Sequence, residues 1–155
     1  MELTTDQSIA YQKAALLCSK SEYCTSEIRE KLKVWGVNKE DAEPVIEKLI
    51  QEKYIDDERF ARAYVKDKFR FNRWGKQKIA YMLRAKNISA EILELAFEEI
   101  QEEKYSNELL KLLADKEKSI KAKDKYDKRN KLMRFALGRG FESNEIYAAF
   151  KELDI

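Results

Sequence analysis

The stretch SEIREKLKVWGVNKEDAEPVIEKL, residues 26–49, decides the fold because its pattern recurs twice further along the chain. It aligns without gaps with QKIAYMLRAKNISAEILELAFEEI, residues 77–100, and with NKLMRFALGRGFESNEIYAAFKEL, residues 130–153. Self-similarity of this kind indicates an array of one repeated structural unit.

Apolar residues occupy equivalent places in the three copies. The first two apolar residues of each copy are four residues apart and therefore lie on one helix face. Four residues later stands Gly36, Asn87 or Gly140, the residue types with which helices end in a left-handed turn. Apolar residues spaced by three, one and three then predict a second helix. These apolar sets are Ile28, Leu32, Val37, Ala42, Val45, Ile46 and Leu49; Ile79, Leu83, Ile88, Leu93, Ala96, Phe97 and Ile100; and Leu132, Ala136, Phe141, Ile146, Ala149, Phe150 and Leu153.

A further helix is predicted before each copy. Ile9, Ala10, Ala14 and Cys18 match Phe60, Ala61, Val65 and Phe69 in register. Before the third copy, the apolar face of this helix is formed by Leu109, Leu110, Leu112 and Leu113. The charged stretch 117–130 is predicted as a longer continuation of that helix. The sequence therefore predicts an all-α protein of three tandem three-helix repeats, 1–55, 56–104 and 105–155. Each repeat has a small core, so neighbours should pack into an elongated, curved molecule.

Composition narrows the possible classes of protein. Only four glycines and one proline leave too few turn formers for an all-β fold. The chain has no histidine, and Cys18 and Cys24 lack zinc-site spacing, so we expect no metal, no cofactor and no histidine-based triad. No apolar run approaches the roughly 18 residues of a membrane span. The N-terminus also lacks the order of a secretory signal, so we expect a cytoplasmic protein without a membrane partner.

Charge is strongly segregated. From Arg59 to Lys86 there are ten basic residues and one acid, Asp67, a local net charge of +9. Because the whole chain carries +2, the rest must sum to −7. A basic middle between acidic flanks predicts a patch for a polyanion or for an acidic protein surface.

The basic residues form a stripe if residues 58–73 are helical. At 100° per residue, five cations fall within about 80° of one another, opposite the apolar face. They are Arg59, Arg62, Lys66, Arg70 and Arg73, and Lys76 and Lys78 follow after Gly75. Of the nearby aromatic residues, we expect Phe69 in the core, whereas Trp74 fits either a core or a base-stacking role.

The acids before this stripe, in YIDDERFA (54–61), have two interpretations. Asp56, Asp57 and Glu58 could be metal ligands of a nuclease-like enzyme. However, consecutive helical residues point about 100° apart, and the sequence offers no further ligand. Asp56 and Asp57 are better explained as caps, which accept bonds from free amides at a helix start. We therefore expect no catalytic residues and no enzyme.

The stretch YIDDERFARAYVKDKFRFNRWGKQKIAYMLRAKNI, residues 54–88, resembles the RecX family of regulatory proteins of bacterial recombination. It is similar to the family pattern of a Tyr-hydrophobic-Asp-Asp start, Arg-Phe-Ala, Tyr-Val, a glycine-rich bend and a basic-Ile pair. SEIREKLKVWGV also resembles the family's first repeat. At the bend, Arg73-Trp74-Gly75-Lys76 lacks one glycine and the proline that members commonly carry.

The resemblance implies a non-enzymatic modulator of the RecA recombinase. Members bind in the groove of the RecA–DNA filament and inhibit strand exchange, ATP hydrolysis and co-protease activity. The cationic residues listed above, from Arg59 to Lys78, would then contact RecA or DNA, with any DNA contact weak and non-specific. We expect a monomer.

One alternative is a helix-turn-helix DNA-binding module that acts without RecA. Against this, the second helix of a copy is acidic or mixed, as in SAEILELAFEEI (89–100), and phosphate repels an acidic recognition helix.

Overall fold

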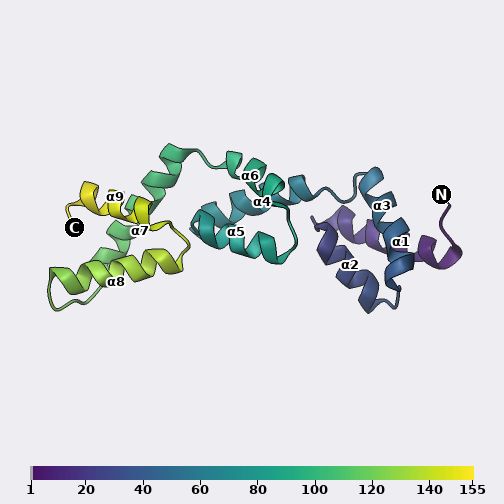
Figure 1. The fold of residues 1–155 in the computed structure, drawn as a ribbon, viewed down its shortest axis with the longest axis horizontal. Helices are drawn as coiled ribbons and strands as arrows, with labels where there is room; N and C mark the ends of the chain where they lie inside the picture. Colours follow the sequence, from purple (N-terminus) through teal and green to yellow (C-terminus); the bar gives the residue numbers. More distant parts are fainter. Residues whose placement is uncertain (1) are drawn as a thin grey trace.

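Each aligned segment folds as two helices joined by a tight turn, and another helix precedes each pair (Figure 1). A computed structural model describes residues 2–155, and these residues form nine α-helices, one 3-10 turn and no strand. The predicted all-α fold of three tandem three-helix units is confirmed. Module 1 holds α1 (Thr5–Lys20), α2 (Thr25–Val34) and α3 (Lys39–Gln51); module 2 holds α4 (Asp57–Arg70), α5 (Lys76–Ala85), α6 (Ala90–Ala96) and the 3-10 turn η1 (Phe97–Glu99); module 3 holds α7 (Glu102–Ser119), α8 (Lys125–Gly138) and α9 (Ser143–Leu153).

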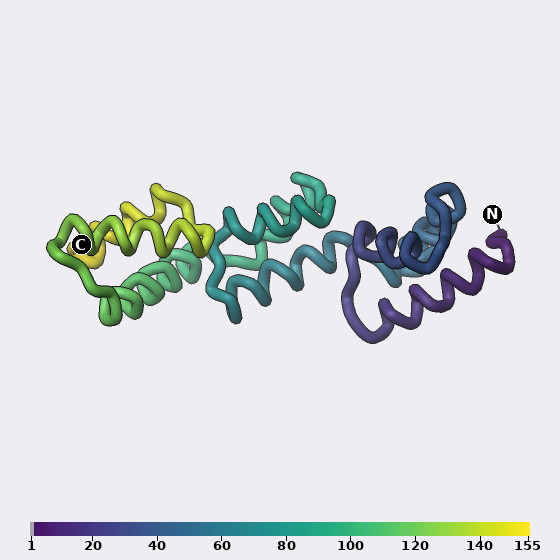
Figure 2. The backbone as a smooth tube through the Cα atoms, turned by 90° about the horizontal axis from the view of Figure 1, so that it is seen from below, coloured from purple at the N-terminus to yellow at the C-terminus, as the bar shows by residue number. Residues whose placement is uncertain are grey.

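The modules follow one another in an elongated, gently arched row, with the two chain ends at its opposite ends (Figures 1 and 2). Among the residues that the structure describes, no helix is long and apolar enough to cross a bilayer.

The turn between the second and third helices has one geometry in all three modules. Gly36, Asn87 and Gly140 have φ angles of 85°, 61° and 96°. The residue after each donates a backbone hydrogen bond to a carbonyl five residues back, as in Val37 to Leu32. This left-handed closure satisfies carbonyls that a helix end leaves free. It is why the sequence repeats a glycine or asparagine there.

Module 1 has a core of its own, whereas modules 2 and 3 share one. Ile28, Leu32 and the apolar residues of α3 form the first cluster. The second cluster runs continuously from α4 to α9 and also takes in Cys24, at the start of α2. Modules 2 and 3 therefore pack as one body, into which module 1 inserts a single buried residue.

Modules 2 and 3 meet through backbone atoms. The amide of Gly75 donates to the carbonyl of Arg139 (2.7 Å), and the amide of Gln77 donates to the carbonyl of Gly140 (2.9 Å). A Cβ atom at Gly75 would lie 2.4 Å from backbone atoms of Gly140. Only glycine permits this approach. The start of α5 thus docks directly on the turn between α8 and α9.

Tyr105 of α7 completes the same junction. Its buried hydroxyl accepts a hydrogen bond from the amide of Lys76 (2.9 Å) and donates one to Glu142. Burial and the Glu142 carboxylate raise the pKa of Tyr105. α5 has no side-chain cap of its own, and module 3 accepts hydrogen bonds from the amides of Lys76, Gln77 and the N-cap residue Gly75.

The junction of modules 1 and 2 is formed by the corresponding elements of those two modules, and here side chains take part in the hydrogen bonds. The Ser26 hydroxyl donates to the carbonyl of Lys86 (2.6 Å), in the turn that follows α5. Thr25 donates through its amide (2.8 Å) and its hydroxyl (3.0 Å) to Asp57. In both junctions, therefore, the second helix of one module begins against the turn of the next.

Three local expectations were wrong at least in part. The helix assumed over residues 58–73 is present, but it begins at Asp57 and ends at Arg70, so Arg73 lies beyond it. The charged stretch 117–130 does not continue one helix, because α7 ends at Ser119 and Asp124 caps a new helix, α8. Ile9 is 62% exposed although its counterpart Phe60 is buried.

Candidate functional site

Arg59 lies at the junction of modules 1 and 2. Its guanidinium pairs with Glu22 (2.8 Å) and donates to the carbonyls of Lys53 and Tyr54. These contacts occupy most of its donors. Arg59 therefore holds the linker between the modules and offers little charge to a partner.

Arg62 is surrounded by three carboxylates. It pairs with Glu58 (2.9 Å) in its own helix and with Glu98 (3.0 Å) and Glu99 (2.9 Å) in η1. Hydrogen bonds to Glu98 and Glu58 raise its pKa. Only 27% of the side chain is exposed. Arg62 thus fastens α4 to η1, which the pattern of charges along α4 does not reveal.

The last three cations of the predicted stripe differ in how far they are neutralised. Lys66 lies 3.7 Å from Glu99 and its side chain is 63% exposed. Arg70 is exposed, forms no ion pair with another described residue and lies against the ring of Phe71. Arg73 reaches across to module 3, where it pairs with Asp115 (3.5 Å) and Glu108 (3.6 Å).

Lys76 and Lys78 do not extend the stripe. The Lys76 ammonium lies over the ring of Tyr105 (4.7 Å to its centroid), at the junction of modules 2 and 3. The Lys78 ammonium lies over Trp74 (4.7 Å), and the Lys68 ammonium lies over the same ring. Phe69 and Trp74 are both partly buried against the shared core. The seven predicted cations therefore do not form one continuous surface.

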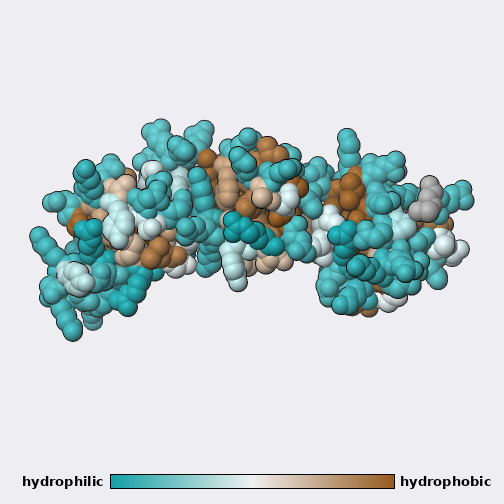
Figure 3. Space-filling view, viewed as in Figure 1, coloured by the Kyte–Doolittle hydropathy of each residue, from teal (hydrophilic) through white to brown (hydrophobic). Residues whose placement is uncertain are grey.

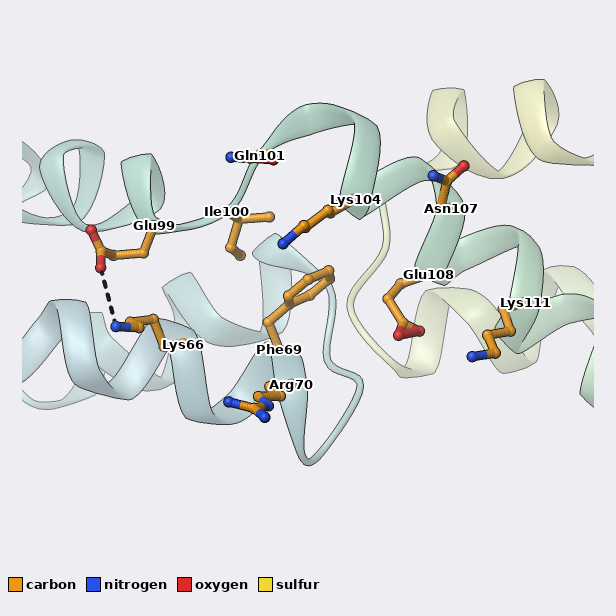
Figure 4. Close-up of a pocket in the computed structure, with 10 residues that line it drawn as sticks. All are labelled: Lys66, Phe69, Arg70, Glu99, Ile100, Gln101, Lys104, Asn107, Glu108 and Lys111. Atoms are coloured by element: carbon orange, nitrogen blue, oxygen red, sulfur yellow. Dashed lines mark ion pairs between the residues drawn. The ribbon is translucent and has the colours of Figure 1, made fainter.

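Two of them instead line a groove between modules 2 and 3 (Figure 4). It encloses about 680 Å³. Phe69 and Ile100 provide apolar surface, and Phe69 and Lys104 both point into the space between α4 and α7 in Figure 4. The lining residues are Lys66, Phe69, Arg70, Glu99, Ile100, Gln101, Lys104, Asn107, Glu108 and Lys111.

Four cations surround this groove, and three of them have no carboxylate partner among the described residues. Lys66 is the exception. Glu99 and Glu108, the acids of the groove, already face Arg62 and Arg73. The three unpaired cations are Arg70, Lys104 and Lys111. An apolar surface beside unneutralised cations can accept an acidic segment that also carries an apolar side chain.

Lys104 and Lys111 were missed by sequence reasoning. They belong to the module after the basic stretch and follow the acidic run EILELAFEEIQEE (91–103). Their spacing of seven, which places both on one face of α7, is the only signal that points to them. That this face turns toward Arg70 depends on how the modules dock.

The aspartates before the stripe have separate roles. Asp56 is the N-cap of α4, and its carboxylate accepts from the amide of Arg59 (3.0 Å). Asp57 is the first residue of the helix, and its carboxylate binds Thr25 of module 1 instead. Within residues 2–155 no group of three or more acidic, cysteine or histidine side chains could hold a metal ion.

Comparison with known families assigns one family model to each module. The first three-helix domain of RecX matches residues 10–49, the second matches residues 56–96 and the third matches residues 103–150. The chain belongs to the RecX family. RecX members therefore share the threefold repeat seen here.

Curated relatives carry the name "Regulatory protein RecX". The RecX protein of Clostridium perfringens strain 13 is 33% identical over 140 residues, which are 88% of this chain and 65% of that protein. The RecX protein of Vibrio parahaemolyticus is 30% identical over 141 residues, which are 90% of this chain and 88% of that protein. The chain thus spans about two thirds of the clostridial RecX and most of the Vibrio RecX.

Two solved RecX structures have the same fold. A crystal structure of a regulatory protein RecX matches with a TM-score of 0.86 at 25% identity, over 94% of this chain and 73% of that one. The crystal structure of RecX from Lactobacillus salivarius matches with a TM-score of 0.84 at 25% identity, over 96% and 97% of the two chains.

Proposed function

We propose that this chain is a RecX-type regulator that binds the RecA–DNA filament and suppresses strand exchange, ATP hydrolysis and co-protease activity, without catalysing a reaction itself. The relatives described above are regulatory proteins by name, which supports a regulatory role. The observation that carries the proposal is the groove between modules 2 and 3. We infer that it acts as a monomer in the cytoplasm.

The composition of the groove suits a protein partner. Protein interfaces are enriched in arginine and aromatic residues at their centres, and charge complementarity at the rim guides association. Phe69 and Arg70 supply such a centre, and Lys66, Lys104 and Lys111 surround it. An acidic surface of RecA with an apolar side chain would fit this arrangement. The elongated row of modules could place further contacts on neighbouring RecA subunits.

The stripe predicted from the sequence contributes less directly to this proposal. Lys66 and Arg70 face the groove and are proposed to touch the partner. Arg59, Arg62 and Arg73 would act by fixing the positions of the modules, because acids of neighbouring segments already engage them. Lys76 and Lys78 would extend the contact only at its margin.

The alternative, a helix-turn-helix module that reads DNA without RecA, has weaker support. In module 2 the third helix, α6, has only seven residues, and the following turn contributes Glu98 and Glu99. These carboxylates face Arg62 and reduce the positive charge of the helix pair. A helix that enters a DNA groove must instead carry positive charge, because the phosphate backbone is negative.

Binding to preformed RecA filaments on single-stranded DNA tests the proposal. The groove variant Arg70→Glu, Lys104→Glu, Lys111→Glu should bind at least about tenfold more weakly than the wild type, because three attractions become repulsions. Arg62 is left unchanged, since its loss would also release η1 from α4. The matched control is Lys20→Glu, Lys33→Glu, Lys151→Glu, at exposed sites without ion pairs among the described residues. Equal binding by the groove variant and the wild type would refute the role of the groove.

A further inference from the structure

A second concentration of positive charge lies in module 3, outside the basic middle. Residues 116–131 contain eight basic and three acidic side chains, a local net charge of +5. Four of these cations, Lys118, Lys121, Lys123 and Lys125, cluster around the loop between α7 and α8, and we call them the lysine tip. The loop lies at the end of the row farthest from module 1 (Figure 1), where hydrophilic side chains cover the face seen in Figure 3.

All three acids of this segment are engaged elsewhere. Asp124 caps α8 by accepting from the amide of Asp127 (2.8 Å). Asp127 accepts from the amide of Lys123 (3.1 Å) and pairs with Lys131 (3.3 Å). Glu117 pairs with Lys128 (2.6 Å). Among the described residues, therefore, no carboxylate forms an ion pair with an ammonium of the lysine tip.

The loop backbone is held in place while these side chains are exposed. The Lys131 ammonium donates to the carbonyl of Lys121 (2.6 Å), and Ile120 packs against the shared core. The bond from the Lys123 amide to Asp127 fixes the other end of the loop. A fixed loop loses less conformational freedom when a ligand binds its side chains.

The unneutralised charge of the lysine tip contrasts with the basic middle. In module 2, Arg59, Arg62 and Arg73 each face one or more carboxylates. With Lys66 and Lys86, five of the ten cations of that stretch form ion pairs with described acids. Of the eight cations of residues 116–131, only Lys128 and Lys131 form ion pairs within the described chain.

The residue types at the tip favour phosphate over protein as the ligand. Lysine is depleted in protein–protein interfaces, whereas it is a frequent contact of the nucleic acid backbone. Tyr126, in the first turn of α8, is 75% exposed among these lysines, and a free aromatic ring can stack on an unpaired base. An acidic protein surface would be expected to meet arginines and a packed apolar centre instead.

We propose that the lysine tip binds the sugar–phosphate backbone of nucleic acid, with Tyr126 stacking on an unpaired base. This site is separate from the groove between modules 2 and 3. One chain could then hold a protein partner at the groove and a nucleic acid strand at the end of module 3. The inference does not depend on the proposed action on RecA.

Fluorescence anisotropy with a labelled oligo(dT) strand and a duplex of equal length tests this site without any other protein. The tip variant changes all four lysines to glutamine, and the matched control is Lys20→Gln, Lys33→Gln, Lys39→Gln, Lys151→Gln. Between about 50 and 200 mM salt, the logarithm of the association constant for single strands falls linearly with the logarithm of the salt concentration. The slope should be shallower by about 3 for the tip variant than for the wild type. The control should keep the wild-type slope. Far-ultraviolet circular dichroism verifies that both variants are folded.

Three results would overturn the proposal. The first is absence of binding to either probe at low salt, and the second is an unchanged affinity and salt slope in the tip variant. The third is a tip variant that keeps nucleic acid binding but loses binding to DNA-free RecA, which would make the tip a protein contact. Tyr126→Ala should weaken single-strand binding by roughly tenfold and duplex binding much less. Equal loss on both probes would refute the stacking contact.

Discussion

The amide of Gly75 donates a 2.7 Å hydrogen bond to the carbonyl of Arg139, so the start of α5 is capped by the turn of the next module. In the preceding junction, the Ser26 hydroxyl bonds the carbonyl of Lys86, which occupies the position equivalent to Arg139. One docking geometry is therefore used twice along the chain. Repeated docking of this kind produces the elongated row.

Gly75→Ala should destabilise this junction. The added Cβ would lie 2.4 Å from the backbone of Gly140, and neither backbone segment can move aside without breaking hydrogen bonds. We expect a loss of about 1–3 kcal/mol in the free energy of unfolding, measured by urea denaturation. Gly138→Ala is the control, because a Cβ there meets nothing within 4 Å. Equal stability of the two variants would refute the close approach.

Tyr105→Phe should cost about 1–3 kcal/mol at neutral pH, because it leaves the Lys76 amide without its partner. Folding raises the pKa of Tyr105, so the folded protein favours the neutral phenol. The stabilisation from this group is thus complete below the unfolded-state pKa of about 10 and is lost as pH rises above it. Between pH 7 and 11, the free energy of unfolding measured by urea denaturation should fall less steeply with pH in the variant than in the wild type. An unchanged slope would contradict the assignment.

Arg62→Ala should lower the melting temperature, because Glu58, Glu98 and Glu99 then repel one another without a shared cation. The loss should shrink in about 1 M salt, where the screening length falls to about 3 Å. Arg70→Ala is the control, since Arg70 has no carboxylate partner in the described part of the chain. If both variants melt alike at low salt, the three-carboxylate contact is not formed in solution.

Substitution should distinguish the roles of Asp56 and Asp57. Asp56→Ala removes a helix cap and should cost about 1 kcal/mol of stability. Asp57→Ala should instead increase hydrogen exchange at the Thr25 amide, because it removes the acceptor that joins modules 1 and 2. Loss of RecA inhibition by Asp57→Ala with unchanged stability and exchange would assign this carboxylate a direct functional role.

The elements that repeat were predictable from the sequence. Gly36, Asn87 and Gly140 occupy equivalent places, and each has the left-handed conformation that its residue type suggests. The buried faces follow local periodicity, so Ile28, Ile79 and Leu132 are all fully buried. Such features need only the few residues on either side of them.

Features that depend on docking between modules could not be predicted. Arg62 looked free because Glu98 and Glu99 approach it only after α6 and η1 fold back on α4. Lys104 and Lys111 reach the groove only because α7 packs beside the end of α4. Gly75 contacts Gly140, a partner 65 positions away along the chain. Local pattern contains no information on such pairs.

The time course of ATP hydrolysis by preformed RecA filaments on single-stranded DNA tests the central proposal most directly. Adding the purified protein should lower the rate, and the groove variant at Arg70, Lys104 and Lys111 should lower it much less at equal concentration. The control variant at Lys20, Lys33 and Lys151 should match the wild type. A rate that the wild-type protein leaves unchanged would contradict a RecA-directed inhibitor, and equal inhibition by the groove variant would place the contact elsewhere on the chain.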